Sequence, residues 1–512
     1  MATVITSVGL KGLEGYRVHV EVQIIPGVEG VTVVGLPDAA VKESKDRVMA
    51  ALFANDCVVP DQKVVINLSP AEQRKNSPIF DVAMAVGIMK EAGYIHDPIP
   101  EDVAFLGVLS LDGSIRPVEG MLPAILAAKN EKIQTVYLPY THDFPLTHLE
   151  GIELRFIQTL SELTQVLSGQ MSFTLPTSPV PVKSNSSSPY TGERDFHHIL
   201  GHSHAKRALE IAAAGGHNVL MSGPPGCGKS LLAETFPSIF PALTQQSQLE
   251  VISIYQLAGH SNPIVNRAPF RSPHHSSSAV SLIGGGSHPK PGEVSLAHHG
   301  VLFLDEMAEF PKRTLDMLRQ PIESGKVTIS RAASTVTYPT RFLLLGAMNP
   351  CPCGFLGARN QYCTCSQKQI QAYQNRVSGP IKDRMDILLT LQPISMNKES
   401  IESNEWSKTI RHRVIEARRL QAERYGREET NATVSFEDVI ELNPLTPSQQ
   451  SMLHQRSANK DWSNRVQVKV IRLARTISDL QGKESITDEA LWEAMTLRRS
   501  NINNNQSIGG VR

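Results

Sequence analysis

Gly223-Pro-Pro-Gly-Cys-Gly-Lys229-Ser230 is the stretch that decides the fold of this 512-residue chain. It matches the pattern G-x-x-x-x-G-K-S, follows the apolar run Asn218-Val-Leu-Met-Ser222 and precedes the helix-like run Leu231-Leu-Ala-Glu-Thr235. In a strand, loop and helix of this kind, backbone N–H groups surround phosphate oxygens at the helix N-terminus. The sequence therefore predicts a phosphate-binding loop rather than an ordinary turn before a helix.

Two side chains of this loop have individual expected roles. Lys229 is expected to reach the β- and γ-phosphates of ATP, and Ser230 to bind the accompanying Mg²⁺. Cys227 stands at a variable position of the pattern, where a small side chain is sufficient. The residues predicted to bind ATP are Gly223, Pro224, Pro225, Gly226, Cys227, Gly228, Lys229 and Ser230.

Length and composition limit the class of protein. A chain of 512 residues is too long for one core, so we expect two to four domains. Its 50 basic and 50 acidic residues cancel, so any contact with nucleic acid must come from local patches. There is no apolar run of membrane-helix length, no signal-peptide pattern at the start and no disulfide framework among the six cysteines. A cytoplasmic protein without membrane contact is expected.

The distribution of patterns along the chain predicts a multidomain α/β protein. Strand and helix patterns mix in residues 1–171, and the Pro- and Ser-rich residues 172–193 are interpreted as a linker. Strands and helices alternate in residues 194–393, which predicts a parallel sheet with helices on both faces. Residues 394–500 predict a helical lid domain, and the polar residues 501–512 a disordered tail.

Two further strand patterns end in polar residues suited to a nucleotide site. The apolar run from Gly300 ends in Asp305 and Glu306, and a parallel sheet would deliver both carboxylates to its carboxyl edge. Asp305 is expected to hold Mg²⁺, and Glu306 to polarise the attacking water. A later apolar run ends in Asn349, whose amide can contact the γ-phosphate or that water.

Two arginines complete the expected catalytic set. Arg384 precedes an apolar strand, where oligomeric ATPases place an arginine that reaches the phosphates of a neighbouring subunit. Such an arginine contributes about 10³–10⁵ in rate; an ordinary surface charge is the alternative. Arg465 opens a basic helix and is a second candidate for sensing phosphate.

Four cysteines form two C-x-C pairs, Cys351-Pro-Cys353 and Cys363-Thr-Cys365, within an insert at residues 351–365. Four thiolates can form a tetrahedral site for a structural Zn²⁺. Because C-x-C is tighter than the usual C-x-x-C spacing, four free thiols or another metal remain alternatives.

Several stretches together resemble a known family. They are Arg271-Ser-Pro-His-His275, Leu282-Ile-Gly-Gly-Gly286, Pro291-Gly-Glu-Val-Ser-Leu-Ala-His-His-Gly300, Asn349-Pro-Cys-Pro-Cys-Gly354 and Arg475-Thr-Ile-Ser-Asp-Leu480. Residues 194–500 resemble AAA+ ATPases of the magnesium-chelatase type, and the whole chain resembles the ComM/YifB family. The resemblance implies a ring, usually hexameric, that moves on DNA and drives branch migration during natural transformation.

The family also implies what the flanking parts do. Residues 1–171 resemble the Lon-protease fold, but Ile79 and Leu122 stand where the catalytic serine and lysine are expected, so we expect no peptidase activity. The pattern of residues 325–338 predicts a hairpin, and that of residues 284–292 a flexible loop. In the wider clade, such a hairpin and such a loop line the ring channel. They make Lys326, Arg331 and Lys290 candidates for DNA contact, with solvated hairpins and loops as the alternative.

Two other functions are compatible with a ring ATPase. A protein-remodelling chaperone would be stimulated by unfolded polypeptide instead of DNA. A metal-insertion motor like the chelatase subunit would need a large porphyrin-binding partner. The branch-migration motor is the favoured hypothesis because the resemblance to ComM/YifB runs through most of the chain.

Overall fold

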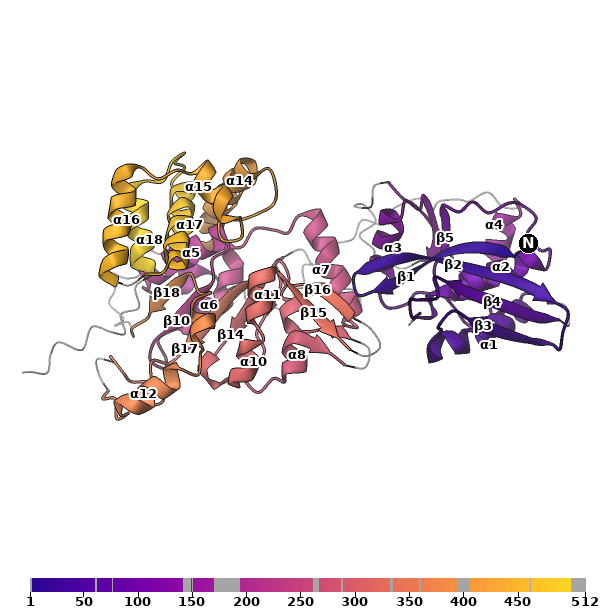
Figure 1. The fold of residues 1–512 in the computed structure, drawn as a ribbon, viewed down its shortest axis with the longest axis horizontal. Helices are drawn as coiled ribbons and strands as arrows, with labels where there is room; N and C mark the ends of the chain where they lie inside the picture. Colours follow the sequence, from indigo (N-terminus) through magenta and orange to yellow (C-terminus); the bar gives the residue numbers. More distant parts are fainter. Residues whose placement is uncertain are drawn as a thin grey trace, which may run out of the picture. The chain divides into compact units, whose positions relative to one another are not determined.

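The computed structural model in Figure 1 forms two compact units. The first contains Met1–Ser186, Gln245–Ile264 and Ser330–Tyr338, and the rest of the chain forms the second. The predicted linker and the predicted tail lie outside the described residues. The structure describes residues 2–59, 62–75, 77–140, 149, 151–169, 194–260, 267–286, 289–331, 335–358, 361–393, 405–460 and 462–498.

A mixed sheet is the centre of the first unit. Its strand order is β3-β4-β2-β1-β5-β8-β9. Strand β2 pairs antiparallel with both β1 and β4, and the other pairs are parallel. The strands are β1 (Thr3–Lys11), β2 (Glu14–Ile25), β3 (Gly30–Val34), β4 (Lys63–Ser69), β5 (Val103–Phe105), β8 (Thr135–Pro139) and β9 (Glu153–Ile157).

Alternating side chains explain how this sheet meets its helices. Val18, Val20 and Val22 of β2 are fully buried, as expected for one face of a strand. Helices α2 and α3 pack on β1 and β2, and Asp38 caps α1 by accepting a hydrogen bond from the N–H of Val41 at 2.9 Å. The helices of residues 1–169 are α1 (Ala39–Ala54), α2 (Asp81–Glu91), α3 (Met121–Asn130) and α4 (Leu160–Leu167).

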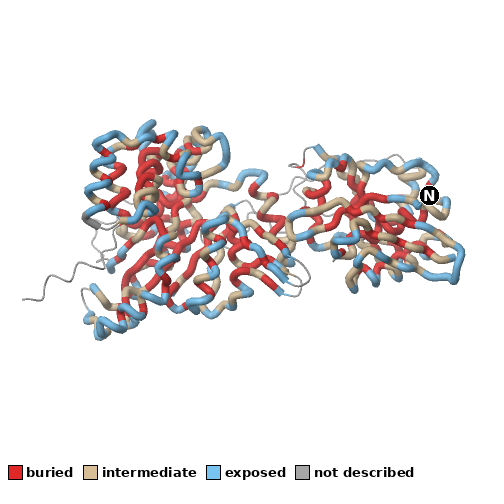
Figure 2. The backbone as a smooth tube through the Cα atoms, viewed as in Figure 1, coloured by how far each residue is buried: buried red, intermediate tan, exposed pale blue. Residues whose placement is uncertain are grey.

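A parallel sheet of order β11-β14-β17-β10-β18 is the centre of the second unit. All four pairings are parallel, so the predicted parallel sheet is confirmed. Strands β10, β14 and β17 are buried along their whole length, as Figure 2 shows for the centre of this unit, because they are almost uninterrupted apolar runs. The outer strands β11 and β18 are only partly buried. The strands are β10 (Val219–Ser222), β11 (Phe270–Arg271), β14 (Val301–Leu304), β17 (Leu343–Met348) and β18 (Ile387–Thr390).

Helices pack beside this sheet and form a separate domain after it. Between residues 405 and 498 the described residues form helices and no strand, which confirms the predicted helical domain. Helix α17 packs against α18 and α5. The helices are α5 (Ser203–Gly215), α6 (Lys229–Thr235), α14 (Ser407–Tyr425), α15 (Phe436–Leu442), α16 (Pro447–Lys460), α17 (Asn464–Leu480) and α18 (Asp488–Leu497).

No helix in the described ranges is both long enough and apolar enough for a bilayer crossing. The remaining helices and strands are β6 (Val108–Leu109), β7 (Ile115–Arg116), α7 (Gln245–Leu257), α8 (Ala279–Ile283), β12 (Gly284–Gly285), β13 (Lys290–Pro291), α9 (Glu293–Leu296), α10 (Lys312–Asp316), α11 (Arg319–Ser324), β15 (Lys326–Ser330), β16 (Thr335–Pro339), α12 (Gln367–Gln374) and α13 (Gly379–Lys382).

Candidate functional site

The phosphate loop connects the end of β10 to the start of α6. Gly226 and Gly228 have φ angles of 74° and 82°, in the left-handed region that disfavours a side chain. Gly228 is also the residue that precedes the first turn of α6. The glycines of the pattern therefore have a conformational role, and the loop leads directly into a helix N-terminus, where an anion is favoured.

Lys229 is buried within this loop. Its Nζ donates hydrogen bonds to the carbonyl oxygens of Gly223 at 2.7 Å and Pro224 at 3.0 Å. It also donates to Oδ1 of Asn349 at 3.1 Å, so two side chains predicted from separate stretches meet here. Phosphate oxygens could replace these acceptors, because an ammonium group has three donors and no fixed geometry.

Ser230 and Asp305 meet on the other side of the loop. Oγ of Ser230 donates to Oδ2 of Asp305 at 2.7 Å. The parallel register explains this meeting, because Ser222 pairs with Met348, and Leu304 pairs with Gly346, at one edge of the sheet. A hydroxyl and a carboxylate at this distance are oxygen ligands suited to Mg²⁺.

Glu306 follows Asp305 in a left-handed backbone conformation, with φ 47° and ψ 43°. This conformation is costly for a residue other than glycine and is typical of functional sites. The side chain is 56% exposed, and its Oε2 lies 3.4 Å from Nδ1 of His275. His275 is a site residue for which no function was predicted from the sequence. It lies in the Arg271–His275 stretch that resembles the family, and this was the available signal.

Arg384 lies at the amino-terminal ends of the parallel strands, opposite the carboxyl ends at which the phosphate loop lies. Its guanidinium pairs with Glu323, and the side-chain amide of Asn218, just before β10, donates to its carbonyl oxygen at 3.2 Å. The four-residue strand β10 separates this edge from the phosphate loop by about 13 Å. Within one chain, Arg384 therefore does not join the Lys229 cluster.

The basic helix α17 divides its cations between surface and interior. Arg465 is exposed in its first turn, without a hydrogen bond to the phosphate loop among the described residues. Lys469 pairs with Asp386 at 2.8 Å, and Arg475 is fully buried and pairs with Asp479 at 2.8 Å. Much of the positive charge of this helix is thus used inside the fold.

The three candidate DNA contacts are exposed on short strand pairs. Strands β15 and β16 pair as the predicted hairpin, with Lys326 at its start and Arg331 just after β15. Lys290 lies on β13, which pairs with β12. Exposure is necessary for DNA contact, which stays a prediction for all three.

The positions related to a Lon active site belong to the core of the first unit. Ile79 and Leu122 are 2% and 0% exposed. Lys75 is also buried, its Nζ donates to the carbonyl oxygen of Pro70, and burial lowers the pKa of its ammonium group. Ile79 and Leu122 are apolar and can supply neither a nucleophile nor a base.

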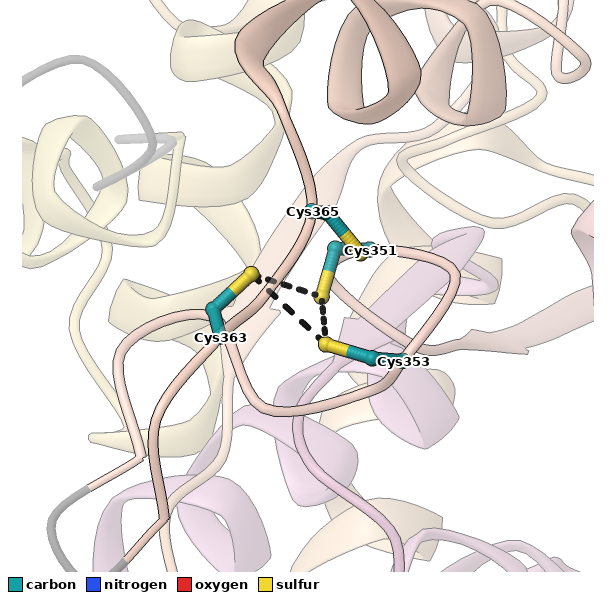
Figure 3. Close-up of side chains that lie close together, drawn as sticks. All are labelled: Cys351, Cys353, Cys363 and Cys365. Carbon is teal, nitrogen blue, oxygen red and sulfur yellow. Dashed lines mark hydrogen bonds between the residues drawn. The ribbon is translucent and has the colours of Figure 1, made fainter.

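The four cysteines converge on one point, as Figure 3 shows. Sγ of Cys351 lies 3.3 Å from that of Cys353 and 3.6 Å from that of Cys363, and all four thiols are free. A hydrogen bond from the backbone N–H of Phe355 lowers the pKa of the Cys353 thiol to about 6. Sulfur ligands about 2.3 Å from Zn²⁺ are roughly 3.8 Å apart in a tetrahedron, so donor type and spacing fit zinc.

Comparison with known proteins finds magnesium-chelatase families over most of the chain, including the phosphate loop and the four cysteines. Family models match residues 195–399 (magnesium chelatase, subunit ChlI), 20–142 (subunit ChlI of Mg-chelatase) and 404–498 (magnesium chelatase, subunit ChlI C-terminal). Competence protein ComM of Haemophilus influenzae is 37% identical over 495 residues, covering 95% of each chain. YifB of Escherichia coli, an uncharacterized protein, is 35% identical over 492 residues, again 95% of each. Lon protease 2 of Bacillus subtilis is 32% identical over 123 residues, 24% of this chain and 22% of its own.

Proposed function

We propose that this chain, which belongs to the ComM/YifB family and has magnesium-chelatase ChlI-like domains, is an ATP-driven DNA motor. Its ATPase domain is of the magnesium-chelatase AAA type, which implies ATP hydrolysis. The motor would promote branch migration or unwinding of DNA during recombination in natural transformation. The name of the Haemophilus relative, a competence protein, supports this choice of process.

The observation that carries the ATPase part is the convergence of four side chains at the phosphate loop. Lys229 contacts Asn349, and Ser230 contacts Asp305. When ATP binds, Lys229 would exchange its carbonyl acceptors for oxygens of the β- and γ-phosphates. Ser230 and Asp305 would hold Mg²⁺, which neutralises charge on the phosphates.

Glu306 is the residue that we propose activates water. Its carboxylate reaches solvent at the same sheet edge and would accept a proton from the attacking water. Asn349 would orient that water or the γ-phosphate. Removing the acceptor while keeping the shape, as in Glu306→Gln, separates binding of ATP from its hydrolysis.

The position of Arg384 leads us to include self-assembly of the chain in the proposal. At the far edge of the sheet it cannot serve its own phosphate loop, but a neighbouring copy could receive it. An arginine supplied in this way stabilises charge in the transition state. We infer a nucleotide-dependent ring, most simply a hexamer, with Arg465 as a second phosphate-sensing residue.

Branch migration suits a motor with modest DNA contacts. Opening a base-pair step costs about 1.4 kcal/mol in stacking, but each pair broken is replaced by another. ATP therefore chiefly supplies direction. Repetition of Lys326, Arg331 and Lys290 around a ring would give a continuous basic channel although the chain has no net charge.

Zinc is the second inferred metal. The convergent thiols of Cys351, Cys353, Cys363 and Cys365 would hold one Zn²⁺, which supplies a structural cross-link and no reaction step.

A strand-exchange assay tests the proposed function. The purified full chain is incubated with MgATP and a three-stranded DNA substrate, beside the Glu306→Gln variant. Exchange by the wild-type chain and its loss in the variant, with ATP binding retained, are expected. Equal exchange by both proteins would contradict an ATP-driven motor.

A further inference from the structure

The four-cysteine segment at residues 351–365 has little to hold its shape apart from its sulfur atoms. Its described residues form neither helix nor strand, and Cys351 and Gly354 are the buried residues among them. Tyr362 is 95% exposed. A segment that buries so little apolar surface cannot offset its own ordering entropy, so a bound metal is the natural source of order.

One end of this segment lies on the phosphate loop. Gly354 has φ 85°, and a Cβ placed on it would lie 2.7 Å from Cδ and 2.9 Å from Cγ of Pro225. Real Cβ atoms do not approach so closely, which means that the backbone at Gly354 touches the Pro225 ring directly. Pro225, inside the ATP-binding pattern, thus packs directly against the four-cysteine segment.

The same segment is continuous with Asn349. Cys351 follows Asn349 by two residues, and its side chain is fully buried. Nε2 of Gln374, on α12, donates to the carbonyl oxygen of Pro350 at 3.1 Å. The intervening chain is therefore held from the cysteine side and from α12 at once.

Helix α12 begins directly after the last cysteine. Ser366 and Gln369 form a capping box at its N-terminus, adjacent to Cys365. Beyond its C-terminus, Arg376 pairs with Glu309 at 2.7 Å, three residues after Glu306. The cysteine segment thus contacts Pro225, α12 contacts the chain just after Asn349, and Arg376 beyond α12 contacts Glu309.

We propose that the metal-bound four-cysteine segment supports the phosphate loop and holds it and Asn349 in their ATP-binding arrangement. Metal occupancy would therefore control the affinity for ATP. This inference rests on the ATP site of the proposed function. The metal would affect the affinity for ATP only through residues of this chain. Cys351 would position Asn349, the acceptor for Lys229, and Gly354 would support Pro225. Release of the metal frees the segment, and both supports weaken together.

Two variants, each with a matched control, distinguish the effect of losing the metal from the effect of disturbing the contact between Gly354 and Pro225. The double variant Cys363→Ser with Cys365→Ser removes two ligands far along the chain from Asn349, and Cys57→Ser removes a buried thiol outside the cluster. Gly354→Ala disturbs the contact with Pro225 and leaves the cysteines intact. Gly357→Ala is its matched control, because Gly357 has a similar φ of 77° but no atom within 4 Å of the added Cβ.

The readouts are zinc content by elemental analysis and affinity for a fluorescent ATP analogue with Mg²⁺, both on the full chain. The wild type is expected to hold one zinc. The double cysteine variant should lose zinc and about tenfold in nucleotide affinity. Gly354→Ala should keep zinc and lose a similar factor, whereas Gly357→Ala and Cys57→Ser should change neither quantity.

The outcomes distinguish this inference from the proposed function. Absence of zinc in the wild type would overturn this inference, and so would loss of zinc from the double cysteine variant with unchanged nucleotide affinity. Equal affinities of Gly354→Ala and Gly357→Ala would also overturn it. Failure of the zinc-loaded wild type to bind the nucleotide would instead contradict the ATP site itself.

Discussion

At the scale of single residues, the pair of Glu306 and His275 is the feature most open to test. The two side chains come from different segments, and 3.4 Å separates Oε2 of the carboxylate from Nδ1 of the imidazole. We therefore expect His275 to act on the attacking water through Glu306, as a positioning residue. His274, its neighbour, instead contacts Oγ of Ser276 at 2.7 Å and provides a control.

The His275→Ala variant is expected to lower kcat for ATP roughly threefold to tenfold, with little change in KM, because the contact that positions the water-activating carboxylate is lost. Steady-state hydrolysis measured beside His274→Ala checks this. A change confined to KM, or equal effects of the two substitutions, would show that His275 does not position Glu306.

Residues that belong to a compact pattern were predictable from the sequence, and residues that act across segments were not. The phosphate loop carries its conformational needs in consecutive glycines, and Asp305 and Asn349 follow buried strands. The structure brings Lys229 to Asn349 and Ser230 to Asp305, and their roles toward ATP and Mg²⁺ stay predictions. The contact of His275 with Glu306 depends on a loop conformation that no periodicity encodes.

At the scale of elements, helix α17 connects the helical domain to the parallel sheet. Lys469 of α17 pairs with Asp386, which precedes β18. Behind it, the imidazole of His217 is fully buried, and its Nε2 lies 2.8 Å from Oγ1 of Thr476. Burial lowers the pKa of His217 to about 4, and nearby Arg472 and Lys469 act in the same direction while Asp386 opposes them.

This histidine gives the second unit a pH-dependent stability. Its pKa is lower in the folded chain than in the unfolded chain, so stability is complete above the ordinary pKa near 6.5 and is lost as pH falls toward 4. The full loss is about 3 kcal/mol. All three tryptophans lie between residues 406 and 492, so tryptophan fluorescence can follow urea unfolding there.

The His217→Gln variant should flatten the decline in unfolding free energy between pH 6.5 and 5. Substitution of the exposed His412 by Gln should leave the decline unchanged. An identical pH profile for wild type and His217→Gln would exclude His217 as its source.

A buried ion pair stabilises α17 from within. Asp479 and Arg475 are both 0% exposed, and Arg424 also pairs with Asp479. Asp479→Ala leaves the buried guanidinium of Arg475 without a carboxylate partner and should destabilise the helical domain by about 3–5 kcal/mol. Glu423→Ala, in an exposed pair with Arg419, should cost less than about 1 kcal/mol. Equal losses in urea unfolding would contradict this account.

At the scale of the whole molecule, domain types were predictable but not their spatial grouping. Alternating strands and helices predicted the parallel sheet, since buried parallel strands read as apolar runs. Residues 245–264 and 330–338 nevertheless cluster with the first unit, where Oε1 of Gln256 accepts a hydrogen bond from the N–H of Leu122 at 3.1 Å. A single polar contact of this kind leaves no pattern in the sequence.

Mixing of two inactive variants tests whether sites are shared between chains. Lys229→Ala and Arg384→Ala should each reduce hydrolysis, the second by about 10³. A mixture should recover part of the activity, because an intact phosphate loop then meets an intact Arg384 from a neighbour. Recovery is measured against each variant alone at the same total concentration. No recovery, with mixed assemblies confirmed by mass, would assign Arg384 to another role.

The most direct test of the DNA motor compares ATP hydrolysis by the full chain with branched DNA, duplex DNA, unfolded polypeptide or no addition. We predict that branched DNA raises the turnover severalfold, that polypeptide leaves it unchanged, and that Glu306→Gln responds to neither. Stimulation by unfolded polypeptide with no response to any DNA would contradict the central claim and favour a protein-remodelling ATPase.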